Sequence, residues 1–510
     1  MPAMSDSQLF VYRPARLALL VCAVALSACA VGPDVVKPTA AAPDDWTTWS
    51  SADPSLRASA GVTQAPHAAW WKAFADPVLD RLQTQAVQAS PDLKTASLRF
   101  AQARVQRSTV SAQRLPEVGV SGSATRQRQS ETGAGTRLID AIGTGSNADD
   151  LKKLLAEPFT LYQAGFDASW ELDLWGRISR SVEAADADIA QQAALLELAR
   201  QSLANDVARN YFELRTTQRQ IRLARDDIAA LDEQVEILSA RVQGGVLDHL
   251  DLERQRAEQA ALKAQLPALL AQESASANQL TLLLGERPGA LHDQLLPIEE
   301  DRPSTMPDLT LGLPSEVALQ RPDIRAAEAA LTSATADIGV AQAALYPSIR
   351  LGAKFGYESY LSGEFSDWGS RTWSIGPSLD LPLFDHGRRK SVVQLRELQQ
   401  QEAAVTYQRT VLKAWQEIDD ALSAYSAEQQ QAQQLDLQVK SAGEAYSLAQ
   451  ARYQGGTIDF SSVLDSQRSY LQARRSLVAS EGRLRTRFVT INKAIGSPLQ
   501  ATGRGSEQAR

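Results

Sequence analysis

Residues 162–174 read YQAGFDASWELDL, and apolar side chains alternate there with small or polar ones over thirteen positions. Such alternation predicts a β-strand with one apolar and one polar face, because successive side chains of a strand point to opposite sides. Residues 349–358 and 373–383 repeat the pattern, and residues 117–126 carry a weaker version. The pattern alone fits either a soluble antiparallel sheet with one solvated face or strands that cross a membrane.

Very long helices follow each pair of predicted strands. Residues 177–242 contain neither Pro nor Gly, and apolar residues recur there every seven positions, at Val207, Leu214, Ile221, Ile228, Val235 and Val242. Residues 418–453 and 463–491 show the same spacing, which is typical of coiled-coil seams. A helix of this length extends for about 100 Å, far beyond what a globular domain needs.

The chain is a tandem duplication. The quartet at residues 90–93 (SPDL) recurs as RPDI at residues 321–324, and the RVQGG of residues 241–245 recurs as RYQGG at residues 452–456. The elements come in the same order in both halves. Two copies are too few for a solenoid. The glycine pair at the end of RVQGG and of RYQGG predicts a turn between two antiparallel helices in each half of the chain.

The N-terminus is predicted to be an export signal. Arg13 and Arg16 precede an apolar run at residues 17–26, which is typical of a signal peptide and too short to span a membrane. The run ends in LSAC at residues 26–29, which resembles a bacterial lipobox, where cleavage falls before the cysteine and the thiol is acylated. Cys29 is therefore predicted to carry a lipid. The alternative is an ordinary secretory signal that leaves Cys29 free.

Composition excludes several classes of protein. A net charge of −8 argues against a nucleic-acid partner. The two cysteines and four distant histidines offer no metal-ligand spacing, and no nucleophile elbow or phosphate-binding loop occurs. We predict no catalytic residue, no metal and no cofactor beyond the lipid. Carboxylate pairs such as Asp226-Asp227 and Asp419-Asp420 are interpreted as solvated helix faces.

Four amphipathic strands cannot span a membrane alone, because two open edges would leave backbone groups unpaired in lipid. Three copies would supply twelve strands, an even number that can close a barrel. The helical hairpins would then line up as a second tube. The charged residues of the polar strand face are expected to line the lumen; they are Asp167, Glu171, Arg350, Lys354 and Asp380.

Several motifs resemble the TolC/OprM/NodT-type outer-membrane factors. They are residues 29–34 (CAVGPD), 70–77 (WWKAFADP), 170–177 (WELDLWGR), 312–315 (GLPS), 321–328 (RPDIRAAE) and 341–348 (AQAALYPS). The resemblance implies an α+β membrane protein with a TolC-like fold: a trimeric barrel with four transmembrane strands per chain, continued by a periplasmic helical barrel with an equatorial domain. It also implies a passive exit duct in the outer membrane that works with an adaptor protein and an inner-membrane pump.

The resemblance also implies a gate at the periplasmic tip. Asp465 is similar to the family's constriction aspartate, and Ser462 stands where some relatives have a second Asp. Tyr453 and Asp251 resemble a pair that joins the two hairpins in the closed state, while Ile458 replaces an Arg of some relatives. On the residues alone, the alternatives are that Asp465 is a helix-start residue beside the helix dipole and that Tyr453 is a seam residue.

The adaptor is expected to contact the helical tips, at the turns formed by Gly244, Gly245, Gly455 and Gly456. Two alternatives to an efflux duct stay open from the sequence: an outer-membrane duct for protein secretion, and a periplasmic coiled-coil scaffold that never enters the membrane.

The predicted organisation is as follows: residues 1–28, lipoprotein signal peptide; 29–75, acylated tether and equatorial segment; 76–287, first repeat, with strands in about 117–175 and a helical hairpin in 177–285; 288–313, equatorial linker; 314–497, second repeat, with strands in about 347–384 and a helical hairpin in 387–496; and 498–510, a flexible tail.

Overall fold

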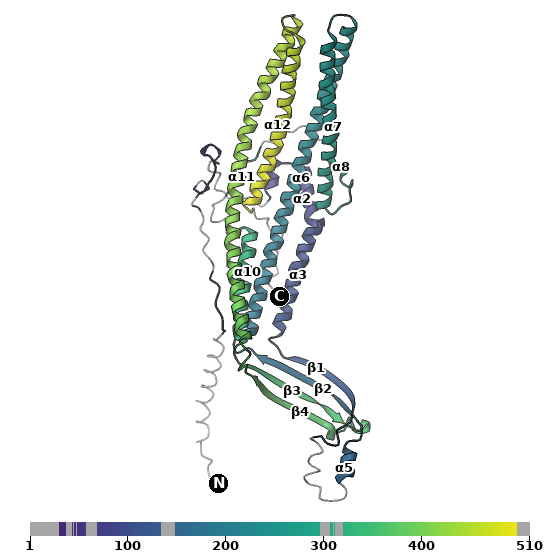
Figure 1. Ribbon diagram of the computed structural model, residues 1–510, viewed down its shortest axis with the longest axis vertical. Helices are drawn as coiled ribbons and strands as arrows, with labels where there is room; N and C mark the ends of the chain where they lie inside the picture. The colour runs from purple at the N-terminus through teal and green to yellow at the C-terminus, as the bar shows by residue number, and fades with distance from the viewer. Residues whose placement is uncertain are drawn as a thin grey trace, which may run out of the picture. The chain divides into compact units, whose positions relative to one another are not determined.

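A computed structural model describes residues 30–36, 43, 45–46, 48–57, 69–133, 148–295, 306–309, 311 and 320–496. The described residues form two compact units, each drawn from both halves of the duplication (Figure 1). The strand unit comprises residues 1–36, 103–188 and 331–402, and the helical unit comprises residues 37–102, 189–330 and 403–510. Cys29, the predicted lipidation site, lies outside the described residues.

The strand unit is built on one antiparallel sheet with the strand order β1-β2-β3-β4 (Figure 1). Its elements are β1 (Glu117–Gln127), α5 (Ala148–Leu155), β2 (Phe159–Leu172), β3 (Ser348–Ser359), η4 (Ser362–Glu364), η5 (Trp368–Ser370) and β4 (Arg371–Asp380). Neighbouring strands pair in register, and β2 pairs with β3 across the two halves of the chain. β1 and β4 are the two edges of this sheet.

Two strand ends differ from the sequence prediction for local reasons. β2 ends at Leu172, because the carboxylate of Asp173 accepts hydrogen bonds from the backbone N–H groups of Ile178 and Ser179, both at 2.8 Å, and so starts the next helix. β4 ends at Asp380, three residues before the predicted end at 383. Pro382 has no N–H to donate to a strand ladder, which fits this earlier end.

The helices are α2 (Pro77–Ala89), α3 (Pro91–Ala112), α6 (Arg177–Gln243), α7 (His249–Leu283), α8 (His292–Leu295), α10 (Pro322–Ala343), α11 (Arg388–Gln454) and α12 (Phe460–Ala494), with short 3₁₀ turns η2 (Pro54–Leu56) and η3 (Trp70–Phe74). α6 and α11 each have 67 residues, and α7 and α12 each have 35. Of the helices that the structure describes, none has a stretch apolar enough to cross a bilayer.

Several residues of the predicted heptad seams lie in the core of the helical unit. Val207, Leu214 and Ile221 are at most 4% exposed. An aromatic cluster adjoins this seam between Val207 and Leu214: the Phe74 ring lies 4.7 Å from that of Phe212 and 5.3 Å from that of Phe488. The segment at Trp70–Phe74, expected to join an equatorial belt, therefore packs against α6 and α12.

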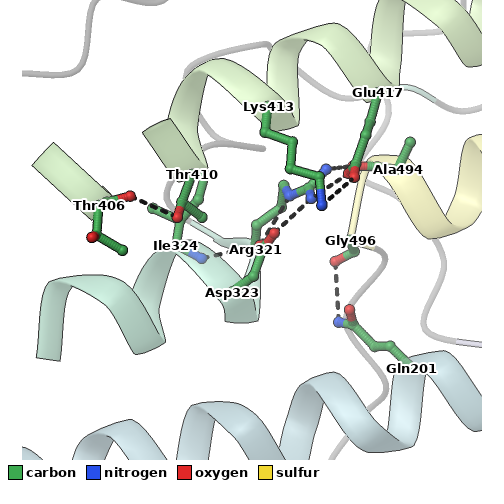
Figure 2. Close-up of polar contacts among 10 residues, drawn as sticks. All are labelled: Gln201, Arg321, Asp323, Ile324, Thr406, Thr410, Lys413, Glu417, Ala494 and Gly496. Carbon is green, nitrogen blue, oxygen red and sulfur yellow. Dashed lines mark hydrogen bonds and ion pairs between the residues drawn. The ribbon is translucent and has the colours of Figure 1, made fainter. Parts of the chain in front are cut away.

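A buried arginine ties three helices of the helical unit together (Figure 2). The guanidinium of Arg321, at the start of α10, donates to both carboxylate oxygens of Asp323 at 3.0 and 2.7 Å and to Glu417 of α11 at 2.7 Å. It also donates to the backbone carbonyl of Ala494 at the end of α12. Its side chain is only 7% exposed. This cluster gives the RPDI motif a structural role at the junction of α10, α11 and α12.

Candidate channel wall and helical tip

The register of the sheet separates apolar and polar residues onto opposite faces. Val120 lies opposite Phe166, Phe166 opposite Phe355, and Phe355 opposite Trp373, so one face is apolar across all four strands. Phe166 is 58% exposed and Trp373 is 70% exposed. Large exposed apolar side chains in a continuous band are typical of a lipid-facing barrel wall.

The opposite face carries a ladder of polar pairs between β2 and β3. Glu171 forms an ion pair with Arg350 at 3.2 Å, and Gln163 donates to Glu358 at 2.6 Å. Asp167 lies directly opposite Lys354 in the register. Four of the five charged residues expected to line the lumen thus take part in this ladder, and the fifth, Asp380, shares the face at the end of β4. Such a wall is compatible with water.

Two matching turns close the ends of the helical hairpins. Gly245 has φ +74°, and Gly456 has φ +71°, conformations that favour glycine. In the first turn the Val246 N–H donates to the Arg241 carbonyl at 2.9 Å, and in the second the Thr457 N–H donates to the Arg452 carbonyl at 3.0 Å. These bonds satisfy carbonyls at the ends of α6 and α11, so the paired glycines act as helix C-caps.

The predicted gate residues lie around these turns, but their contacts differ from the expected pairing. The ring of Tyr453 lies 5.2 Å from that of Phe460, and Asp251 forms an ion pair with Arg254 at 3.8 Å. Within the described tip, no hydrogen bond joins Tyr453 to Asp251. Asp465 and Ser462 are both exposed on the first turns of α12.

Comparison with known proteins decides the family. The sequence matches the outer membrane efflux protein family over residues 82–286 and 313–497. The chain belongs to this family. It is 31% identical over 443 residues to the pyoverdine export outer membrane protein OpmQ of Pseudomonas putida, covering 86% of this chain and 89% of that protein. It is 30% identical over 509 residues to the probable efflux pump outer membrane protein TtgC of the same species, and the match covers 97% of this chain and 98% of that protein.

The solved structure of the outer-membrane channel OprN matches this outer membrane efflux protein with a TM-score of 0.81 at 31% identity, covering 92% of this chain and 100% of that chain. The predicted family, TolC-like fold, outer-membrane location and efflux-channel function are therefore confirmed. Members are passive channels, in agreement with the prediction of no enzymatic activity. Channels of this family are trimers, and relatives belong to tripartite efflux pumps.

The efflux protein also contains a buried polar junction that the sequence did not reveal. The side-chain oxygen of Gln234 on α6 accepts hydrogen bonds from Gln255 of α7 at 2.8 Å and from Gln467 of α12 at 2.9 Å. Its amide donates to the hydroxyl of Tyr446 on α11 at 3.1 Å. One glutamine thus links all four hairpin helices. The heptad pattern predicted only apolar contacts here, and nothing in the spacing of these glutamines marked them.

Asp227 corrects one sequence interpretation. It was expected on a solvated helix face, yet it is only 4% exposed and pairs with Arg474 of α12 at 3.0 Å. Its neighbour Asp226 is exposed, because one residue along a helix turns the side chain by about 100°. Burial raises the pKa of the Asp227 carboxyl, and the adjacent Arg474 and Arg475 oppose that rise only in part.

This shift predicts a pH dependence of stability. A carboxyl with a raised pKa binds a proton more readily in the folded state, so its contribution to the free energy of unfolding grows as the pH falls towards the ordinary value of 3.8 and is lost above the raised pKa. When the pH is lowered from 7 to 4, the melting temperature of Asp227→Asn should therefore change less favourably than that of the wild type, because the variant lacks this carboxyl. Thermal unfolding at both pH values measures this, with the exposed neighbour variant Asp226→Asn as control. Equal pH responses in wild type and Asp227→Asn would contradict it.

Among the described residues, no group of His, Cys, Asp and Glu is placed to hold a metal ion.

Proposed function

We propose that three copies of this chain close one outer-membrane barrel, continued by a periplasmic helical tunnel, and that this duct conducts small molecules out of the periplasm. The sheet carries the proposal: one face is apolar and exposed, the other is polar, and the outer edge of each of the two edge strands, β1 and β4, is unpaired within the sheet. Open edges are unstable in lipid, so β1 of one copy pairing with β4 of the next satisfies them.

The proposed partners are a periplasmic adaptor protein and an inner-membrane pump. TtgC is named as an efflux pump protein and OpmQ as a pyoverdine exporter, and their similarity over most of this chain supports a role in efflux. The tips at Gly244–Gly245 and Gly455–Gly456 are the proposed adaptor contacts, since each presents backbone groups and exposed side chains at a hairpin end. Cys29 is the proposed site of acylation.

We propose Asp465 as the constriction residue of the tip, with Ser462, Tyr453 and Asp251 around it. Asp465 is exposed, and within the described tip no ion pair neutralises it. Three such carboxylates around one axis would repel each other and favour cations. Tyr453 and Asp251 would change partners between states of the gate, from Phe460 and Arg254 to each other.

Planar-bilayer recording tests the duct and the gate together. The wild-type trimer should give discrete, cation-selective conductance. Asp465→Ala should raise the conductance roughly severalfold and lower the cation selectivity, because the anionic ring is removed. Asp436→Ala, which removes an exposed carboxylate of α11 paired with Lys440, is the matched control and should leave both unchanged. A channel that Asp465→Ala does not alter would refute the gate assignment and leave the duct.

A further inference from the structure

We propose that residues 30–34 occupy a groove built by Gly176, Arg180 and Gly339, and that this groove fixes where the lipid anchor on Cys29 leaves the protein. The groove itself stands on described contacts, and its role in anchoring rests on the proposed acylation. All of these described residues belong to the strand unit.

The segment is held by a set of hydrogen bonds centred on one arginine. The Val31 N–H donates to the carbonyl of Trp175 at 3.2 Å. The guanidinium of Arg180 donates to the carbonyls of Val31 and Gly32, both at 3.3 Å, and to the carboxylate of Asp34 at 3.0 Å. The Arg180 side chain is only 9% exposed. A buried guanidinium that serves two backbone carbonyls and one carboxylate of a single segment is a specific binding arrangement.

Three glycines make room for the segment. A Cβ on Gly32, whose φ is +116°, would lie 2.5 Å from the Cα of Gly339. A Cβ on Gly339 would lie 2.8 Å from Arg180 Cγ and 2.9 Å from the Val31 carbonyl oxygen. A Cβ on Gly176 would lie 2.9 Å from the Cβ of Ala30. The backbone of residues 30–32 therefore approaches α6 and α10 more closely than any side chain would allow.

The positive charge of Arg180 is paired with one carboxylate of the bound segment and with one carboxylate of α6. Arg180 forms a second ion pair with Glu183 on its own helix at 2.8 Å, while Asp34 comes from the bound segment. Removing the guanidinium would leave two backbone carbonyls without their donor and Asp34 without its partner. The groove also gives a shared role to the CAVGPD and WELDLWGR motifs, which the duct alone does not explain.

The position of the groove matches that of a membrane boundary. Ala30 packs on Gly176, between the end of β2 and the start of α6. Next to it, the rings of Trp175 and Tyr346 stack at 4.8 Å, and the Trp175 indole donates to the Pro347 carbonyl at 2.8 Å. Trp and Tyr are enriched at the headgroup level of bilayers. An anchor one residue before Ala30 would enter the membrane at the end of the strands.

Hydrogen exchange on the purified full-length trimer tests the groove, and intact mass reports acylation separately. We expect the Val31 amide, whose N–H donates to the Trp175 carbonyl, to be protected in wild type and to exchange on the order of tenfold faster in Arg180→Gln and in Gly339→Ala. Gly339 lies inside α10, where alanine is a better helix former than glycine, so faster exchange cannot be ascribed to a weakened helix. Gly369→Ala, where nothing lies within 4 Å, is the control and should match wild type.

The outcomes separate the groove from the proposed acylation. The groove would be overturned if the Val31 amide of acylated wild-type protein were not protected, or if both variants kept its protection. A protected segment on a chain without acyl groups would overturn the anchoring role, while the conductance of that chain would still report on the duct. If Arg180→Gln fails to fold, Gly339→Ala decides.

Discussion

Phe166→Arg should strongly reduce assembly of the protein in the outer membrane. Phe166 lies in the middle of β2 on the apolar face, opposite Val120 and Phe355, and it is 58% exposed. An arginine at the lipid face of a barrel costs about 2–4 kcal/mol near the bilayer midplane, and each of three copies would bear that cost. We expect folded trimer in membrane fractions to fall to a small part of the wild-type amount.

Ser169→Arg is the matched control for this prediction. Ser169 lies in the same strand on the polar face, opposite Glu117 and Gly352. The same side chain should be tolerated there, with normal trimer and a reduced preference for cations. Heat-modifiable trimer on gels and single-channel selectivity measure the two effects. Equal assembly of Phe166→Arg and Ser169→Arg would mean that the apolar face does not contact lipid.

Arg321→Ala should destabilise the helical unit by about 1.5–3 kcal/mol, because two partly exposed carboxylates lose a charged donor and a buried backbone carbonyl is left without its hydrogen bond. Asp323 and Glu417 would lose their shared donor, and the carbonyl of Ala494 would lose its bond at the end of α12 (Figure 2). Arg321→Lys should recover part of the loss, since an ammonium keeps the charge but not the planar fork. Denaturant unfolding followed by circular dichroism, at fixed protein concentration, measures these changes.

Lys413→Ala provides the comparison at the same carboxylate. Lys413 pairs with Glu417 at 3.5 Å, but its side chain is 69% exposed. Its loss should change the free energy of unfolding by less than about 0.5 kcal/mol. If Arg321→Ala and Lys413→Ala behaved alike, the buried cluster would not be a main support of the junction.

Most of the fold was predicted from the spacing of apolar residues and from the length of the segments that show this spacing. The alternation at residues 162–174 predicted a strand with two different faces, and the sheet register places those faces as expected. The heptads at Val207 and Leu214 predicted a buried seam, and both residues are fully buried. These features could be predicted from the sequence because each depends on residues that are close together along the chain.

The features that the sequence did not reveal depend on partners far along the chain. Arg180 binds Val31, 149 residues away, and Gln234 meets Gln467, 233 residues away. Asp227 was misjudged because it is buried against α12, where its partner Arg474 lies 247 residues further along the chain. Spacing within one helix carries no information on such contacts.

Disulfide trapping between the edge strands most directly tests whether three copies close one barrel. β1 and β4 are separated by two strands, about 14 Å in sheet spacing, whereas a disulfide needs Cα atoms within about 7 Å. A cysteine at Ser121 should therefore link to one at Ser374, Gly376 or Ser378 only in another copy. For at least one pair, we predict covalent dimers and trimers from oxidised membranes, with nothing larger than a trimer and only monomers from single-cysteine controls. Monomers for every pair, or a ladder that continues beyond the trimer, would contradict a closed three-copy barrel.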